Sequence, residues 1–390
     1  MATISKNYIW KKKLLGIVII VFLILAAVIH FSNKDYYYRT LWYNLPGIFD
    51  EPIFYSRTVQ KSDHALPWPE ASAYNSIELS KQVLDSLSKY ETVSVLFIQH
   101  DSVLVEKYWL GATDTTRSNS FSVAKSFVGA LIGRAIQLGY IKSIDQPVGY
   151  FLKDFSEGEK RNITIRHLLT MSSGLDWNEA YSSLWSQTTE AYYGTEIEKQ
   201  MLALSSKQKP GEYFEYQSCD TELLALILVK ATGMPLATFF EKELWQPLGA
   251  VTSASWSLDH EEGMEKAYCC LYSNPKDFAR LASLYLHNGN WNGKQLIDST
   301  FVLQSVTPSK LMDIRTKEIT DLYGFQWWLI PDYKGISVFY MRGILGQYII
   351  AIPSLDMIVV RLGHKRGVKI NNHYSETYTL IEEAIRLSKK

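Results

Sequence analysis

Strand-like runs at both ends of the chain, with helices between them, most constrain how this sequence can fold. After a helical pattern over residues 76–90, runs at 93–99 and 103–109 flank a short polar turn and predict a hairpin. The final third returns to strands, which we expect at 323–329, 336–341, 347–352 and 357–362, before a closing helix at 374–388. The stretch from about 140 to 320 is mostly helix and loop. This order predicts an α/β (α+β) fold, with one sheet assembled from both chain ends around a mostly helical insertion.

A serine and a lysine three residues apart, Ser122 and Lys125, open a long apolar run. On a helix this spacing places both side chains on one face. A lysine that desolvation keeps partly neutral can take the proton of the hydroxyl and make the serine a nucleophile. The pair therefore matches the S-x-x-K arrangement.

The tetrapeptide alone is weak, because the sequence contains it four times, beginning at Ser86, Ser122, Ser206 and Ser273. Only Ser122 follows a turn-rich segment and enters a helix apolar enough to be buried. Pro275 interrupts the last copy, and the other two lie in polar surroundings. A helix N-terminal serine beside a solvated lysine stays open as the alternative for Ser122.

The N-terminal 31 residues have the pattern of a membrane anchor. Three lysines at positions 11–13 precede residues 14–31, which carry no formal charge. Eighteen helical residues span about 27 Å, close to the hydrocarbon thickness of a bilayer. Because no small-x-small cleavage site follows, we expect residues 1–31 to form an uncleaved anchor, with the lysines cytoplasmic and the catalytic part outside the membrane. Secretion after signal cleavage is the alternative. A lead-in arm (32–75) and the main domain (76–390) would follow.

Composition adds two limits. Basic and acidic residues balance at 40 each, so no nucleic-acid-binding surface is predicted. The three cysteines, Cys219, Cys269 and Cys270, are odd in number and two are adjacent. They indicate no disulfide framework and no metal spacing, so their roles stay open.

Four segments in order carry a family resemblance: the Ser122 motif, residues 163–175, residues 210–218 and residues 323–329. With them, residues from about 50 to 385 resemble the serine beta-lactamase-like family, which includes class C beta-lactamases, DD-peptidases, esterases and 6-aminohexanoate-dimer hydrolases. The resemblance implies a beta-lactamase/transpeptidase-like fold with an antiparallel sheet. It also implies a serine hydrolase that cleaves an amide or ester bond through an acyl-enzyme, without a metal or an organic cofactor.

The resemblance assigns catalytic roles to four residues. Ser122 would attack the substrate, and Lys125 would take its proton. Tyr216 begins the second family motif, which is Tyr-x-Ser in this chain. It would pass a proton to the leaving group, and we expect the nearby Lys125 ammonium to lower its pKa. Ser218 ends that motif and would hydrogen-bond Lys125. Serine at this place resembles the 6-aminohexanoate-dimer hydrolase branch.

The third family motif, Lys/His-Thr/Ser-Gly, is missing, and residues 341–347 take its place. Gly343 keeps the glycine that lets a substrate approach the backbone. The resemblance implies that the N–H groups of Ser122 and Ile344 form the oxyanion hole. Arg342 is a candidate to replace the Lys or His of the missing motif. In a regular strand, however, its side chain points to the opposite face from that of Met341. Efficient beta-lactam hydrolysis is therefore not expected.

Three further residues are candidates for substrate binding. Glu179 and Tyr181 resemble a site-lining loop of the 6-aminohexanoate-dimer hydrolases, and a solvated loop with packed aromatics is the alternative. His364 follows the last strand and can reach the pocket rim, unless it is a surface histidine. Asp277 and Arg280 look like an ion pair on a helix surface.

These observations predict a membrane-anchored serine hydrolase with a small-molecule amide or ester substrate. One alternative is a DD-peptidase or beta-lactamase acting on peptidoglycan or beta-lactams. Another is a catalytically silent binding or sensor protein that keeps the fold.

Overall fold

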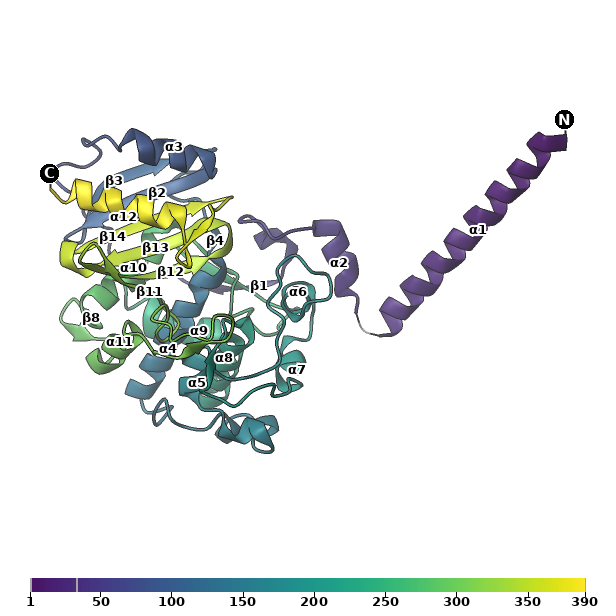
Figure 1. The fold of residues 1–390 in the computed structure, drawn as a ribbon. Helices are drawn as coiled ribbons and strands as arrows, with labels where there is room; N and C mark the ends of the chain where they lie inside the picture. The colour runs from purple at the N-terminus through teal and green to yellow at the C-terminus, as the bar shows by residue number, and fades with distance from the viewer. Residues whose placement is uncertain (1, 33, 390) are drawn as a thin grey trace.

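A six-stranded antiparallel sheet is built from both ends of the chain (Figure 1). Its strand order is β11-β12-β13-β14-β2-β3. The hairpin β2 (Thr92–Gln99) and β3 (Ser102–Tyr108) pairs through β2 with the C-terminal strand β14 (Met357–Gly363). The other three strands are β11 (Trp328–Tyr333), β12 (Ile336–Gly343) and β13 (Gln347–Ile352). The predicted assembly of one sheet from both chain ends is confirmed.

The computed structural model describes residues 2–32 and 34–389, without the side chains of residues 2–7, 25 and 28. Residue 1 of the predicted anchor, residue 33 of the predicted lead-in arm and residue 390 of the predicted domain therefore lie outside the described residues.

Both faces of the sheet are covered by helices, which explains why its central strands are apolar on both sides. In β2, Val95 and Phe97 face α3 (Lys81–Lys89) and α12 (Ser375–Leu387), whereas Leu96 and Ile98 belong to the opposite core. That core includes α10 (Pro275–Leu286), which packs on β13 and β14. Alternate side chains of a strand point to opposite faces, so a strand buried twice reads as a continuous apolar run.

The segment between β3 and β11 consists mostly of helices and loops, as expected, but it also contains short strands. A second sheet has the order β1-β6-β7-β4, formed by β1 (Ser56–Val59), β6 (Ala254–Ser257), β7 (Leu271–Ser273) and β4 (Ser118–Asn119). The strand β1 belongs to the expected lead-in arm and pairs with β6, so the arm is part of the folded body. The remaining short pairs are β5 (Tyr213–Phe214) with β10 (Met312–Asp313), β8 (Asn290–Trp291) with β9 (Lys294–Gln295), and β15 (Lys369–Ile370) with β16 (His373–Tyr374).

Helix α4 (Ala124–Gln137) lies at the centre of the helical part, buried from Ala124 to Ala135, and packs against α8 (Ser218–Thr232). The other helices of this part are α5 (Ile165–Leu169), α6 (Gln187–Tyr193), α7 (Ile197–Leu202), α9 (Leu236–Phe240) and α11 (Ser299–Ser305). The burial of α4 agrees with the reading of the apolar run that follows Ser122.

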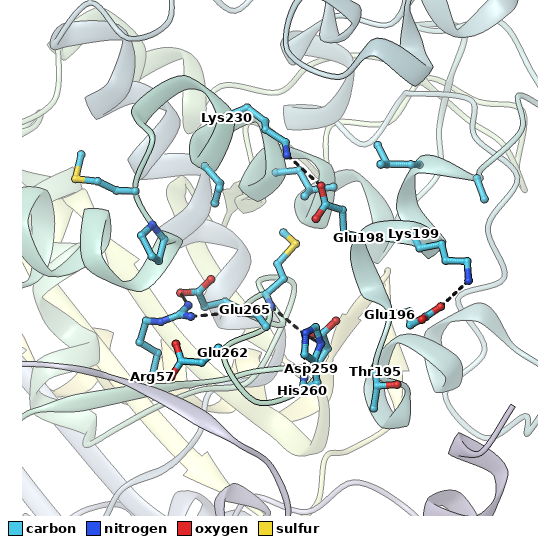
Figure 2. Close-up of a pocket in the computed structure, with 18 of the residues that line it drawn as sticks. Arg57, Thr195, Glu196, Glu198, Lys199, Lys230, Asp259, His260, Glu262 and Glu265 are labelled. Atoms are coloured by element: carbon cyan, nitrogen blue, oxygen red, sulfur yellow. Dashed lines mark hydrogen bonds and ion pairs between the residues drawn. The ribbon is translucent and has the colours of Figure 1, made fainter. Parts of the chain in front are cut away.

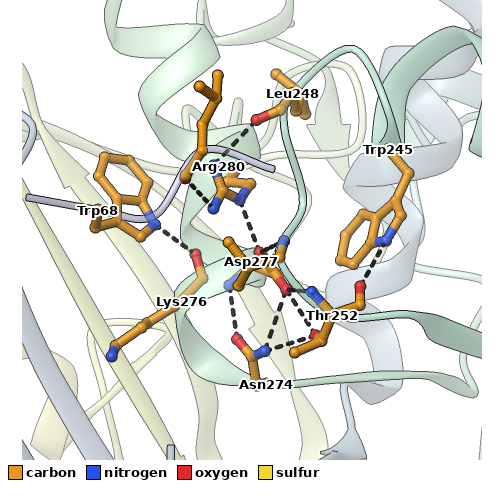
Figure 3. Close-up of polar contacts among 10 residues, drawn as sticks. Trp68, Trp245, Leu248, Thr252, Asn274, Lys276, Asp277 and Arg280 are labelled. Carbon is orange, nitrogen blue, oxygen red and sulfur yellow. Dashed lines mark hydrogen bonds and ion pairs between the residues drawn. The ribbon is translucent and has the colours of Figure 1, made fainter. Parts of the chain in front are cut away.

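Three expectations about elements are wrong in detail. The helix expected over residues 76–90 begins only at Lys81, because Ser80 caps its N-terminus with an extended backbone. The first C-terminal strand begins at Trp328 rather than at residue 323, because Gln326 has a positive φ of 64° and turns the chain just before the strand. The ion pair of Asp277 and Arg280 is also not on a surface. Both side chains are buried, and Arg280 Nε donates to Asp277 Oδ1 over 2.7 Å (Figure 3).

The N-terminal helix α1 (Ala2–Phe31) extends away from the folded body, and α2 (Tyr36–Tyr43) lies between them (Figure 1). Its apolar span Tyr8–Phe31 is the single straight helix in the described chain that is long and apolar enough to cross a membrane. None of that span is buried against the body. The bent pair of α8 and the segment Leu236–Trp245 is similarly apolar, but its residues lie in the core.

Candidate active site

Ser122 lies in a 3₁₀ turn, Phe121–Val123, directly in front of α4. The preceding residue, Phe121, has a φ of +46°, a conformation that costs energy for a bulky side chain. The Asn119 side chain holds this turn, because its Oδ1 accepts from the N–H groups of Phe121 over 2.8 Å and of Cys270 over 3.2 Å. The turn leaves Ser122 partly exposed at the junction of the sheet and the helical part.

Lys125 is buried one helical turn behind Ser122, with 1% of its surface exposed. Its Nζ lies 3.3 Å from Ser122 Oγ, 3.1 Å from Ser218 Oγ and 2.7 Å from the Tyr268 carbonyl oxygen. Burial lowers the pKa of Lys125 to about 8, although the charges of Glu179 and Glu222 oppose the shift. A neutral amine has two N–H groups and one lone pair. When the two N–H groups donate to Ser218 Oγ and the Tyr268 carbonyl oxygen, the lone pair can accept the proton of the Ser122 hydroxyl.

Glu179 holds Ser218 in place. Its Oε1 accepts from Ser218 Oγ over 2.7 Å, and its Oε2 accepts from the Ser218 backbone N–H over 2.7 Å. Tyr181 Oη and Trp177 Nε1 donate to the same carboxylate at 2.6 and 2.7 Å. Since both oxygens already accept these bonds, Glu179 is better placed to orient Ser218, and through it Lys125, than to bind a substrate. Tyr181 lines the cavities described below.

Tyr216 packs beside Lys125, whose Nζ lies 5.5 Å from the centre of the phenol ring. Burial raises the pKa of Tyr216 above its ordinary value, and the Glu179 charge raises it further. Hydrogen bonding with Ser122 and the charge of Arg342 act in the opposite direction but do not reverse the shift. The expectation of a lowered pKa is therefore wrong, because the cost of burying a phenolate exceeds the stabilisation by nearby cations. The phenol keeps its proton at neutral pH.

The end of β12 approaches the turn that carries Ser122. A Cβ added to Gly343 would lie 2.3 Å from the Ser120 carbonyl oxygen, so only glycine fits without a backbone shift. Ile344 follows and borders both cavities that contain Ser122. Arg342 points away from the buried Met341, as strand alternation predicts, and its Cζ lies 3.2 Å from the centre of the Trp328 ring.

Two cavities meet at Ser122. One, of about 350 Å³, lies between the sheet and the helical part. Its lining includes Glu179, Tyr181, Tyr216, Trp328, Arg342, Gly343, the cationic residues Arg315, Arg366 and Lys369, and the acidic residues Glu215 and Asp313. The second, of about 340 Å³, extends toward the N-terminal segment. His364 borders neither cavity. Its ring packs 5.6 Å from that of Phe49, and its backbone N–H donates to the Glu91 carbonyl, so its predicted binding role gains no support.

Another cavity, of about 1090 Å³, shares no lining residue with the two at Ser122 (Figure 2). Most of its charged groups are paired with one another. Arg57 pairs with Glu265 at 2.5 Å, Lys230 with Glu198 at 3.2 Å and Lys199 with Glu196 at 2.7 Å (Figure 2). These ion pairs neutralise most of the charge that lines this cavity. In the described part of the chain, no cluster of three His, Cys, Asp or Glu residues is placed to hold a metal ion.

Cys269 and Cys270 form a disulfide between adjacent residues, a pairing that the sequence analysis did not predict. It follows Tyr268, whose carbonyl oxygen binds Lys125, and Cys269 lines the second cavity. The adjacency of the two cysteines was the signal for this pairing. Cys219 is buried and free.

A family model described as Beta-lactamase matches residues 81–373 of the chain. The chain belongs to the beta-lactamase family. The match includes Ser122, Lys125, Tyr216 and the β12 segment, and agrees with the antiparallel sheet flanked by helices.

Individual proteins are also similar to this chain. The 6-aminohexanoate-dimer hydrolase of Paenarthrobacter ureafaciens is 26% identical over 289 residues, which cover 70% of this chain and 72% of that protein. A candidate 6-aminohexanoate-dimer hydrolase from Bacillus anthracis superposes with a TM-score of 0.74 at 20% identity, over 87% of this chain and 92% of that one. A family VIII carboxylesterase superposes with a TM-score of 0.61 at 15% identity, over 80% of this chain and all of the other. At these identities the two structures show a shared fold.

Proposed function

We propose that this protein is a serine hydrolase that cleaves an amide or ester bond through an acyl-enzyme on Ser122. The observation that carries the proposal is the position of Lys125. Its amine is almost fully buried, has a pKa of about 8 and lies 3.3 Å from Ser122 Oγ. A lysine in this state is a general base at neutral to mildly alkaline pH.

The reaction follows from the positions of the side chains. Lys125 takes the proton of Ser122 as its Oγ attacks the substrate carbonyl carbon. The N–H groups of Ser122 and Ile344 receive the developing oxyanion, a contribution of roughly 10²–10³ in rate for one such donor. Tyr216, which is protonated, gives its proton to the leaving amine or alkoxide and is reprotonated from Lys125. Water then hydrolyses the acyl-enzyme.

Cations in the first cavity support a substrate with an anionic group. Within the described residues, Arg342, Arg366 and Lys369 form no ion pair with a carboxylate, and all three line this cavity. Burial and then the charges of the neighbouring arginines lower the pKa of Lys369, and the nearby Asp313 carboxylate offsets this shift only in part. A small linear amide or ester with a carboxylate would place that group here. The named reaction of the 6-aminohexanoate-dimer hydrolase relative agrees with such a substrate.

The test is turnover of 4-nitrophenyl acetate by the detergent-solubilised full chain, with Ser122→Ala compared at equal folding. We expect activity in the parent, none above background in Ser122→Ala, and labelling of the parent alone by a fluorophosphonate. Ser86→Ala is the matched control, since Ser86 heads another S-x-x-K tetrapeptide on α3. Equal turnover in parent and Ser122→Ala would overturn the proposal. A folded parent that neither turns over the ester nor takes the label would favour the silent binding protein.

Beta-lactams and D-alanyl peptides form the second substrate panel. The missing Lys-Thr-Gly motif predicts that linear amides and esters are turned over faster than either. The reverse order would favour the DD-peptidase or beta-lactamase alternative.

We also propose that α1 anchors the protein in the membrane, with the catalytic domain outside. The exposed apolar span Tyr8–Phe31 and the lysines at positions 11–13 support this placement.

A further inference from the structure

The second cavity at Ser122 is walled by the N-terminal segment that connects the apolar helix α1 to the body. Its lining joins Leu41, Leu45 and Pro46 from this segment to Leu184, Ile344 and Ser122 itself. Its volume of about 340 Å³ falls in the range of small-ligand pockets, roughly 300–1,000 Å³. The nucleophile therefore borders two spaces of different chemistry, one rich in charged side chains and one mainly apolar.

Hydrogen bonds attach this wall to both the apolar helix and the body. Tyr38 Oη on α2 donates to the Ala26 carbonyl of α1 over 3.0 Å. The Arg39 guanidinium donates to the carbonyl oxygens of Ile53 over 2.7 Å and of Tyr193 over 3.2 Å. Helix α2 lies next to the end of α1 (Figure 1), and its residue Leu41 lines the cavity. If α1 crosses the membrane, the cavity opens close to the bilayer surface.

Large apolar side chains that line this cavity, or that neighbour its lining residues in the sequence, are exposed. The exposed fractions are 70% for Leu41, 83% for Trp42, 63% for Leu45 and 78% for Trp185. The Trp185 ring packs 5.4 Å from that of Tyr37, so the loop after Tyr181 and α2 form one surface. Exposed apolar patches mark interaction sites, and tryptophan beside a membrane helix favours the interface between lipid and water.

We propose that the second cavity binds the acyl chain of a membrane lipid whose ester or amide carbonyl is attacked by Ser122. The patch formed by Leu41, Trp42, Leu45 and Trp185 rests on the bilayer surface and leads the chain from the membrane into the cavity. This inference rests on the proposed hydrolase function. In the reaction, Ser122 Oγ bonds to the acyl carbon, the bond to the head-group oxygen or nitrogen breaks, and that atom takes the proton. Water then releases the fatty acid and regenerates Ser122.

Substrate chain length tests the proposal on the full chain in detergent. Burying a methylene favours binding about fourfold, from roughly 0.8 kcal/mol for each group. We therefore expect kcat/KM for 4-nitrophenyl octanoate to exceed that for the acetate at least tenfold. In Leu41→Glu, which places a carboxylate at the opening, we expect the ratio of the two constants to fall about tenfold. Leu41 is 70% exposed, so this change leaves the core intact.

Leu303→Glu is the matched control, because Leu303 is 62% exposed on α11 and lines neither cavity at Ser122. The octanoate-to-acetate ratio of kcat/KM in Leu303→Glu should equal that of the parent. Because the longer ester partitions into micelles equally for every variant, comparing the ratios of the variants removes this effect. A parent that hydrolyses the acetate without preference for the octanoate would overturn the acyl-chain site and leave the hydrolase proposal standing. A parent inactive on both esters would overturn both. An unchanged ratio in Leu41→Glu, with a shift from dimer to monomer in sedimentation, would assign the patch to self-association instead.

Discussion

Burial acts on Lys125 and Tyr216 in opposite directions on the pKa scale but with the same chemical result. Desolvation penalises the charged form of each, so it lowers the pKa of the amine and raises that of the phenol. The resting site therefore tends toward a neutral base and a neutral acid beside the Ser122 hydroxyl. This is the combination that acyl transfer needs, because one group must accept a proton before the other donates one.

The pKa of Lys125 predicts a pH profile. The neutral amine is the base, so kcat/KM for 4-nitrophenyl acetate should rise through a midpoint near pH 8 and level off above it. The guanidinium in Lys125→Arg stays protonated over this pH range, so this variant should lose both the activity and its rise near pH 8. Lys89→Arg, in the tetrapeptide that begins at Ser86, should keep the parent profile. A parent profile that is flat between pH 6 and 10 would show that Lys125 is not the titrating base.

Tyr216→Phe separates proton donation from nucleophilic attack. Loss of a general acid typically costs about 10²–10⁴ in rate when the leaving group needs a proton. We expect a loss of this size for a linear amide and a much smaller one for a nitrophenyl ester, since nitrophenolate leaves unprotonated. Tyr213→Phe, a nearby tyrosine on β5, is the control and should change neither rate. Equal losses on both substrates would assign Tyr216 to packing or orientation.

At the residue scale, the sequence predicted contacts that depend on local spacing and missed those that depend on loop placement. The contact of Ser218 with Lys125 was expected and lies at 3.1 Å. Glu179 was expected near the site. Its hydrogen bonds to Ser218 depend on how the loop that carries it packs against α8, which residue spacing does not predict. The strained Phe121 turn also had no sequence signal, because aromatic residues give no warning of a positive φ.

At the scale of elements, α10 connects the lead-in arm to the helical part through buried polar contacts (Figure 3). Asp277 accepts from the backbone N–H groups of Val251 and Thr252 at 3.0 and 2.9 Å. Arg280 donates to the carbonyl oxygens of Leu248 and Leu66 at 3.0 and 2.7 Å. The pair therefore joins segments that are far apart in the sequence, which explains why it is buried rather than on the helix surface.

Asp277→Ala should lower the free energy of unfolding by about 3–5 kcal/mol, because it leaves the Arg280 charge buried without its partner. Urea unfolding of the full chain in detergent, followed by circular dichroism, measures the change. Asp145→Ala is the matched control, since Asp145 pairs with Arg166 at 2.6 Å with both side chains substantially exposed. Breaking that pair should cost only about 0–1 kcal/mol. Similar losses in the two variants would show that the buried network adds little.

The sheet strands were predictable because period-2 burial and continuous apolar runs mark strands of six or more residues. The strands of the second sheet were not, since two to four residues are too few for a period to show. The start of β11 was missed for a different reason. Aromatic residues at positions 323–328 favour a strand, but the chain turns at Gln326 before pairing begins.

At the scale of the whole molecule, the exposed span Tyr8–Phe31 has two explanations, a permanent anchor or a signal that is removed. As a helix its 24 residues would reach about 36 Å, enough to cross the hydrocarbon core. The hydrogen bond from Tyr38 to Ala26 favours the anchor, because it uses the end of α1 to position the α2 wall of the second cavity.

We therefore expect the chain to keep its N-terminal helix and to stay with bacterial membranes after alkaline carbonate extraction. With the lysines at positions 11–13 on the cytoplasmic side, a tag after the C-terminal helix α12 should be digested by protease added to intact spheroplasts. A cytoplasmic protein tagged in the same way is the control and should resist digestion until the cells are lysed. A chain that lacks residues 1–31 and is released by carbonate would instead show secretion after cleavage. In that case, α2 would keep only its contacts with the body, among them those of Arg39 and of the Tyr37 ring, and the lipid-facing role of the patch at Leu41 would lose its anchor.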